Sequence, residues 1–203
     1  MKYLFIALLA ALVFSCNLPE VPKNLPMYGF HDVDPATGDT IYHTIPDFSF
    51  LNQDSVAVTN ATFAGKAYVA DFFFTSCPTI CPKVKQQMMR LYERYRNDDR
   101  LLLLSYTIDP KRDTVGKLRD FAGRMGVSSD KWHFVTGDKD KIYALADDYM
   151  SIATENPDAP GGFDHSGWLL LIDKDRHIRA YCNGTKAEEV TKFMDDIDWL
   201  LAH

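Results

Sequence analysis

Cysteine is scarce in this chain, which has four cysteines among its 203 residues. A scaffold held together by disulfides carries more, and a domain of this size can build a hydrophobic core without them. Cys16 lies close to the N-terminus, which leaves Cys77, Cys81 and Cys182 for the rest of the chain. Three is an odd number, so in an oxidising compartment at least one of these thiols is unpaired or has another task.

The chain also lacks a basic cluster and a membrane-spanning apolar run. Its net charge is −6, and its Lys and Arg residues are scattered, so the sequence indicates no nucleic-acid surface and no nucleic-acid partner. The longest apolar run, Tyr3 to Phe14, has twelve residues. That is too short to span a bilayer comfortably and has the length of the apolar segment of a signal peptide.

The N-terminus predicts a lipid anchor. Lys2 precedes the apolar run, and the run ends in Val13-Phe14-Ser15-Cys16, which resembles a bacterial lipobox. The alternative is a plain secretory signal cut before Asn17. We favour residues 1–16 as a lipoprotein signal peptide with lipidated Cys16. The protein would then be anchored to a bacterial cell membrane, with its domain facing the periplasm or the cell exterior.

Residues 17–45 are expected to form a tether and an N-terminal extension. The first part, 17–26, contains three prolines and shows no periodicity. A turn signal at 34–39 separates Tyr28-Gly29-Phe30 from Thr40-Ile41-Tyr42, which predicts a hairpin-like extension. Residues 46–203 would then form one folded domain.

The pattern of this domain predicts an α/β fold. Near-continuous apolar runs predict strands covered on both faces, and apolar residues at helical spacing lie between them. A short hairpin is expected at 48–51 and 56–58, strands at 68–74, 101–108, 132–135, 168–172 and 177–181, and helices around 84–95, 118–125, 142–149 and 190–200. Parallel strands followed by a hairpin fit a thioredoxin-like fold with extra elements.

Cys77 and Cys81 are the leading candidates for chemistry, because they follow the first buried strand where its helix should begin. With Pro78 in the first helical turn, the two cysteines would lie one turn apart with Cα atoms roughly 6 Å apart, within reach of a disulfide. The helix N-terminus would favour thiolates, which also bind soft metals. Two buried structural cysteines are the alternative, less favoured because open α/β sheets bind ligands at this edge.

A metal site needs a third ligand, and His165 is the best placed of six histidines. It follows the loop 159–164 and precedes the strand 168–172, and in a thioredoxin-like topology that loop passes beside the cysteines. From the residues alone, a ligand and a solvated loop histidine are equally good interpretations. The others lie in the N-terminal extension, in an apolar strand, beside a turn and at the C-terminus: His31, His43, His133, His177 and His203.

Five ordered sequence blocks resemble the SCO/SenC family: residues 71–82, 109–114, 132–137, 164–166 and 170–173. The resemblance implies a membrane-tethered, thioredoxin-fold copper protein that helps to build the dinuclear copper centre of cytochrome c oxidase. By matching position, Cys77, Cys81 and His165 correspond to the family's copper ligands. The chemistry agrees, because thiolates suit Cu(I) and imidazole suits copper in either oxidation state.

For several residues other than the three candidate copper ligands, the sequence predicts a role less specifically. Asp71 is either a proton-handling group or a hydrogen-bonded strand residue, and Asp109 ends the second buried strand. Asp113 is expected to be the N-cap of the next helix. Arg176 stands where the family often has Gly, so the turn type could differ. Cys182 is expected on the closing hairpin, away from the cysteine pair.

Two functions remain open at this stage. The leading hypothesis is a monomeric copper metallochaperone whose partner is a copper-accepting or disulfide-bearing oxidase subunit. The alternative is a thiol-disulfide oxidoreductase that uses Cys77 and Cys81 as a redox-active pair. Gly167 occupies the position of the cis-proline of thioredoxin-type enzymes, which favours metal binding. A peroxide-reducing enzyme is disfavoured, because it needs a Thr or Ser closer to one nucleophilic Cys.

Overall fold

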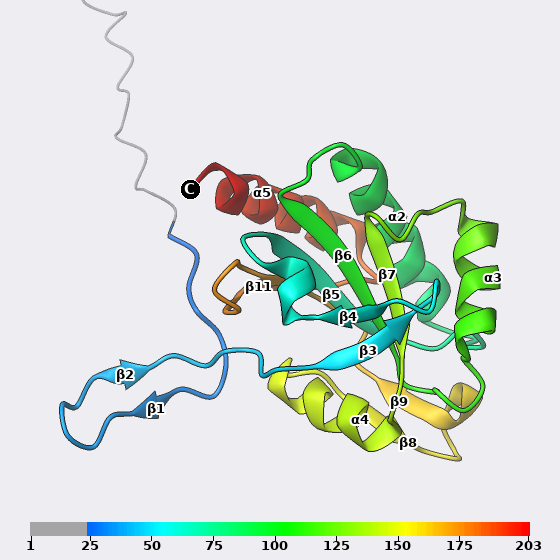
Figure 1. Cartoon of the computed structure of the whole chain (residues 1–203), viewed down its shortest axis with the longest axis horizontal. Helices are drawn as coiled ribbons and strands as arrows, with labels where there is room; N and C mark the ends of the chain where they lie inside the picture. The colour runs from blue at the N-terminus through cyan, green and yellow to red at the C-terminus, as the bar shows by residue number, and fades with distance from the viewer. Residues whose placement is uncertain (1–23) are drawn as a thin grey trace, which may run out of the picture.

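The computed structural model describes residues 24–203, so the predicted signal peptide, Cys16 and the start of the tether lie outside it. A seven-stranded sheet in the order β11-β10-β5-β6-β7-β3-β4 forms the centre, with helices packed against it (Figure 1). Its strands are β3 Ser49–Asn52, β4 Ala57–Thr59, β5 Ala67–Phe73, β6 Leu101–Thr107, β7 Trp132–Thr136, β10 Trp168–Ile172 and β11 Ile178–Asn183. The helices are α2 Cys81–Tyr95, α3 Val115–Met125, α4 Lys139–Asp148 and α5 Ala187–Ala202, with short 3₁₀ helices η2 Asn60–Phe63 and η3 Pro160–Gly162.

The predicted parallel core is confirmed. Strands β5, β6 and β7 run parallel, and every residue in them is buried. Burial on both faces explains why these strands read as continuous apolar runs rather than alternating ones. β10 and then β11 add antiparallel to one side of this core, and β3 and β4 add antiparallel to the other. The carboxyl ends of the parallel strands therefore share one edge of the sheet.

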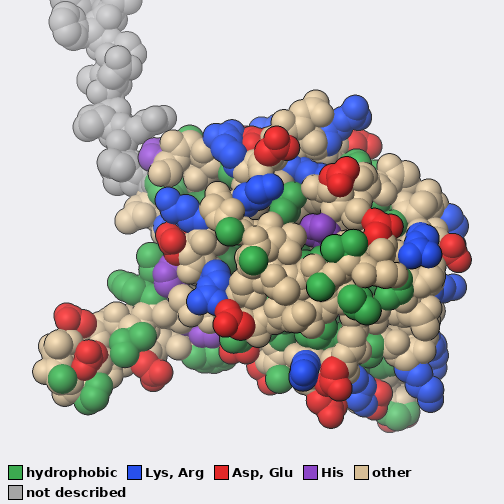
Figure 2. Space-filling model, viewed as in Figure 1, with side chains coloured by type: hydrophobic (Ala, Val, Ile, Leu, Met, Phe, Trp, Pro, Cys, Tyr) green, Lys and Arg blue, Asp and Glu red, His purple; other side chains and the backbone are tan. Residues whose placement is uncertain are grey.

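The N-terminal hairpin exists, but its strands are shorter than predicted and its first strand is shifted. β1 (Asp32–Val33) pairs with β2 (Thr40–Ile41) around the predicted turn. Tyr28 does not join this hairpin, because its backbone bridges Ile178 of β11 instead. Figure 1 shows the hairpin standing away from the sheet, and Figure 2 shows apolar and acidic side chains along it.

The segment before β1 is held by the main domain through its backbone. The Arg179 guanidinium donates hydrogen bonds to the carbonyls of Leu25 and Pro26. No helix within residues 24–203 is long and apolar enough to cross a membrane. On the face drawn in Figure 2, positive and negative side chains are interspersed and form no large basic patch.

The start of α3 corrects one prediction. Its N-cap is Thr114, whose side chain accepts a hydrogen bond from the Lys117 backbone N–H, and not Asp113. Asp113 is 1% exposed and hydrogen-bonds elsewhere, as described below. A Ser, Thr, Asp or Asn can serve as N-cap, so two adjacent candidates leave the choice to tertiary contacts.

The turn between β10 and β11 keeps the backbone conformation that glycine favours. Arg176 has φ of 72°, in the left-handed region, even though it carries a side chain. The Asp173 carboxylate fixes the turn by accepting hydrogen bonds from the backbone N–H groups of Asp175 and His177. The replacement of glycine by Arg176 therefore leaves the left-handed turn in place.

Candidate metal site

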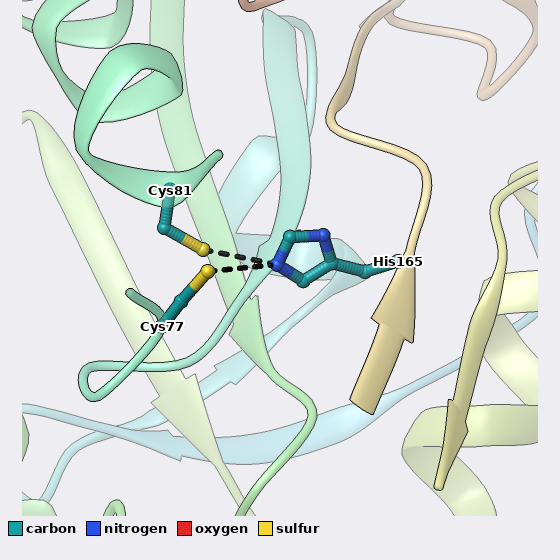
Figure 3. A group of neighbouring side chains, drawn as sticks. All are labelled: Cys77, Cys81 and His165. Carbon is teal, nitrogen blue, oxygen red and sulfur yellow. Dashed lines mark hydrogen bonds between the residues drawn. The ribbon is translucent and has the colours of Figure 1, made fainter. Parts of the chain in front are cut away.

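The structure brings Cys77, Cys81 and His165 together at the carboxyl end of β5 (Figure 3). Nε2 of His165 lies 3.1 Å from Sγ of Cys81 and 3.5 Å from Sγ of Cys77. All three donor atoms lie within 4.8 Å of one another, and both cysteines are free and buried. Among residues 24–203 no other group of three His, Cys, Asp or Glu side chains converges in this way.

The geometry of the cysteines differs from the prediction. α2 begins at Cys81, and Pro82, not Pro78, occupies its first turn, where a missing N–H leaves no hydrogen bond unmade. Cys77 lies before the helix in a tight turn, where its backbone N–H donates to the carbonyl of Phe74. The two cysteines therefore do not share a helix face. The turn preceding α2 is what brings the sulfur of Cys77 to that of Cys81.

His165 also lies in a more ordered place than the predicted loop. It ends the short strand β9 (Phe163–His165), which pairs antiparallel with β8 (Ala153–Glu155). This small second sheet holds the backbone from which the imidazole projects. The Phe74 ring meets the imidazole edge to face, with ring centroids 5.4 Å apart.

Gly161 allows the β9 segment to approach the cysteine turn. Its φ is 84°, and a Cβ on this residue would lie 2.8 Å from the ring of Phe74. Both the left-handed backbone and the missing side chain are therefore required here. Gly167 lies at a similar close approach, where a Cβ would be 3.0 Å from Ile80, just before α2.

The protonation of the three residues follows from burial and local hydrogen bonds. Burial alone would raise the pKa of Cys77, but hydrogen bonds from the backbone of Thr79 and Cys81 outweigh it and lower the pKa. Burial raises the pKa of Cys81 far above its ordinary value. Burial lowers the pKa of His165, so its imidazole is neutral at pH 7. A metal that binds here would release the remaining thiol proton.

The imidazole presents the correct nitrogen for a metal. Nε2 faces the two sulfurs, while Nδ1 is buried and has no hydrogen-bond partner within the described chain. A neutral imidazole carries one N–H, so a metal on Nε2 places that hydrogen on Nδ1. Two thiolates and one imidazole form a soft donor set that suits copper. The residues present therefore fit a copper ion.

Asp113 holds the cysteine turn in place, a role that sequence reasoning missed. Its carboxylate accepts hydrogen bonds from the backbone N–H and the hydroxyl of Thr75, two residues before Cys77. It also accepts one from the hydroxyl of Thr107 at the end of β6. Asp109, by contrast, pairs with the Arg112 guanidinium at 3.0 Å and does not join the metal-ligand group.

Asp71 is part of a buried ion pair whose other member, Lys85, was also missed. Lys85 Nζ lies 2.7 Å from Oδ2 of Asp71, and both side chains are almost fully buried. Lys85 comes one helical turn after Cys81, and that spacing was the signal available in the sequence. Of the two interpretations, Asp71 is at least a hydrogen-bonded, ion-paired strand residue.

A cavity of about 370 Å³ opens beside the two cysteines, between α2 and α3. Apolar side chains dominate its lining, and Lys85 is the one charged residue among them. The lining residues are Phe74, Thr75, Cys77, Cys81, Pro82, Lys85, Gln86, Met89, Phe121 and Met125. Both cysteines therefore line this cavity, and His165 does not.

Cys182 lies on β11, as predicted, and takes no part in the group of three donors. It is buried opposite Leu169 of β10. Burial raises the pKa of its thiol to about 12, so it is a weak nucleophile at neutral pH.

Fold and site together define a thioredoxin-like α/β protein with a Cys₂His group at the edge of its sheet. The chain belongs to the SCO1/SenC family, whose sequence model matches residues 36–202. The resemblance that the sequence blocks indicated is thereby confirmed.

Three similar proteins illustrate the relationship. The SCO1 protein homolog of Bacillus subtilis (strain 168) is 26% identical over 161 residues, which cover 78% of this chain and 83% of that protein. The structure of BsSco, a member of the Sco family of cytochrome c oxidase assembly proteins in which a disulfide switch was identified, superposes with a TM-score of 0.68 at 26% identity, covering 78% and 93%. Arabidopsis thaliana ScoI with copper bound has the same fold, with a TM-score of 0.64 at 22% identity, covering 78% and 98%.

Proposed function

We propose that this protein binds copper through Cys77, Cys81 and His165 and acts in the assembly of the dinuclear copper centre of cytochrome c oxidase. The observation that carries the proposal is the convergence of two free thiols and one imidazole within 4.8 Å. Membership of the SCO1/SenC family supports the proposed role in oxidase assembly, because the related protein BsSco belongs to a family of cytochrome c oxidase assembly proteins. The partner would be a copper-accepting oxidase subunit.

The arrangement suits a carrier of copper better than a permanent copper site. Three protein donors leave a coordination position free, so a ligand from a partner can enter before those of the carrier leave. The cavity between α2 and α3, which both cysteines line, would give such a ligand a route to them. The copper ion is then cargo, and the domain supplies a binding site that can be opened by ligand exchange.

Thiol-disulfide exchange is a second candidate, favoured by the unequal thiols. The pKa of Cys77 is lowered and that of Cys81 is raised, so Cys77 would be the nucleophile in such an exchange. Its thiolate would attack a partner disulfide to give a mixed disulfide and release one partner thiol. Cys81, losing its proton, would then displace the second partner sulfur. The partner gains two electrons, and Cys77 and Cys81 become a disulfide.

Anaerobic titration with Cu(I) and Cu(II), beside a disulfide-reductase assay, tests these functions. We expect one copper per chain in the wild type. Cys77→Ser and Cys81→Ser should each weaken Cu(I) binding by more than about 100-fold, since even outer residues of metal sites contribute 10–100-fold. Cys182→Ser is the matched control and should bind like the wild type. If Cys182→Ser lost copper while Cys77→Ser retained it, the site would be wrongly assigned.

We further propose that Cys16 carries lipid, that residues 17–45 connect it to the domain at 46–203, and that the protein is a monomer. Cys16→Ser is expected to move the protein from the membrane fraction to the soluble fraction, or to block processing of the signal peptide. Fractionation and intact mass measure both effects. A variant that stayed on the membrane with an unchanged mature mass would contradict the lipid anchor.

A further inference from the structure

The first residues that the structure describes are fixed to the edge strand β11. Leu25 is buried, and its carbonyl and that of Pro26 accept hydrogen bonds from the Arg179 guanidinium. Two residues further on, the backbone N–H of Tyr28 donates to the carbonyl of Ile178, the first residue of β11. The chain therefore enters the folded domain at a fixed place, beside the amino end of β11.

This place lies at the opposite end of the sheet from the candidate metal ligands. Arg179 lines a cavity of about 330 Å³ together with Ala67, the first residue of β5, and Arg100, which precedes β6. Cys77 follows the other end of β5. The seven residues of β5 separate its two ends by roughly 20 Å. The cavity and the metal site therefore lie at opposite ends of the parallel strands.

Apolar side chains from the end of α5 form one side of this cavity. They are Trp199, Leu200 and Leu201, and each is only partly buried. Figure 1 shows the end of α5 on the same side of the molecule as the start of the described chain. Tryptophan has an apolar body and a polar N–H, so it favours the boundary between lipid and water.

The charges around the cavity do not repel an anionic bilayer. Its lining holds three basic and two acidic residues, although the whole chain has a net charge of −6. Arg100 and Arg179 are each paired with an aspartate. Lys174 is exposed and forms no ion pair within residues 24–203, with the exposed Asp175 beside it. Lys174 is therefore the basic side chain that remains for a lipid phosphate.

The length of the chain before Leu25 limits what this end of the domain can meet. Leu25 follows Cys16 by nine residues. Nine fully extended residues span about 30 Å at most. A lipid on Cys16 would therefore keep the root of the domain, and the cavity beside it, within about 30 Å of the bilayer.

We propose that the cavity between the end of α5 and the β10–β11 turn is a membrane-contact surface, and that its ligand is the phospholipid bilayer that holds Cys16. Trp199 lies at the level of the headgroups, and Lys174 contacts a lipid phosphate. The three candidate copper ligands then face the aqueous side, where a partner can reach them. This inference rests on the proposed lipid anchor and is independent of copper binding.

Quenching of tryptophan fluorescence by brominated lipids tests this orientation in the full-length, membrane-bound protein. Of the three tryptophans, Trp132 is fully buried, Trp199 lines the cavity, and Trp168 begins β10 at the metal-site end of the sheet. The vesicles contain phosphatidylethanolamine and phosphatidylglycerol, with or without bromine on the acyl chains. The brominated lipid should quench the wild type. Trp168→Phe should keep this quenching, and Trp199→Phe should lose it.

A charge reversal tests the contact with the headgroups. Lys174→Glu should reduce the quenching of Trp199, because anionic lipid repels the new carboxylate. Lys111→Glu is the matched control, because Lys111 is also exposed but follows β6 at the metal-site end of the sheet. It changes the net charge by the same amount and should leave the quenching unchanged. Equal effects of the two variants would show that no headgroup contact is made at Lys174.

Three further results would overturn the inference. If Trp168→Phe lost the quenching and Trp199→Phe kept it, the metal-site end would face the membrane. If the membrane-bound wild type showed no quenching, the cavity would meet water or protein, including a second copy of this chain, and not lipid. If the wild type stayed in the soluble fraction, the lipid anchor would be wrong and this inference with it. Copper titration of the same sample would still test the proposed copper site.

Discussion

Oxidation of Cys77 and Cys81 to a disulfide is expected to abolish tight copper binding. The two sulfurs lie within 4.8 Å of each other, so they can join with a small movement of the turn before α2. A disulfide sulfur is no longer a thiolate, so oxidation removes two of the three ligands at once. His165 alone would remain, and the affinity for Cu(I) should fall by several orders of magnitude.

The measurement uses Cys182→Ser, in which these two cysteines are the only thiols of the described chain. The protein is oxidised, the intramolecular disulfide is confirmed by mass, and Cu(I) is titrated against a competing chelator. Reduction should restore binding in the same sample. Copper bound by the oxidised form as tightly as by the reduced form would show that the thiolates are not both ligands.

The same linkage works in the other direction. Because copper binds only the reduced pair, bound copper should make the pair harder to oxidise. Each 1.4 kcal/mol of copper-binding free energy raises the reduction potential of this two-electron couple by about 30 mV. Copper delivery and thiol reduction are therefore competing uses of one pair of sulfurs, and the metal content of the domain decides which is available.

The sequence predicted the sheet well because its central strands are buried on both faces. Such strands are continuous apolar runs, and β5 and β6 were found within one residue of their observed ends. The convergence of the candidate ligands could be predicted from topology, since Cys77 and His165 flank strands that pair in the centre of the sheet. The N-terminal hairpin was harder, because strands of two residues leave no periodic signal.

The backbone conformation and the contacts around Cys77 and Cys81 could not be predicted from the spacing of these residues in the sequence. Cysteines four residues apart suggested one helix face, but a turn that places Cys77 outside α2 has the same spacing. The tie between Asp113 and Thr75 joins residues 38 positions apart, and the pair Asp71–Lys85 joins a strand to a helix. Such contacts depend on how the helices and strands pack, and the local spacing of residues in the sequence does not predict them.

His165→Ala is expected to lower the affinity for Cu(II) much more than the affinity for Cu(I). Two soft thiolates are enough to bind Cu(I), so the affinity of the variant for Cu(I) should fall only moderately. Cu(II) depends more on the imidazole nitrogen, which lies 3.1 Å from Sγ of Cys81 in the metal-free geometry. We expect the Cu(II) affinity to fall by more than about 100-fold, beyond the effect of outer residues, with loss of the intense visible absorption of thiolate-bound Cu(II).

His203→Ala is the control for this variant, because His203 is exposed at the end of α5 and belongs to no ligand group within residues 24–203. It should keep the wild-type spectrum and both affinities. Thermal unfolding of the metal-free proteins checks that His165→Ala still folds, since its ring packs against Phe74. Retention of wild-type Cu(II) affinity and spectrum by a folded His165→Ala would remove His165 from the ligand set. The site would then consist of the two thiolates alone, and the convergence of β9 on the cysteine turn would need another explanation.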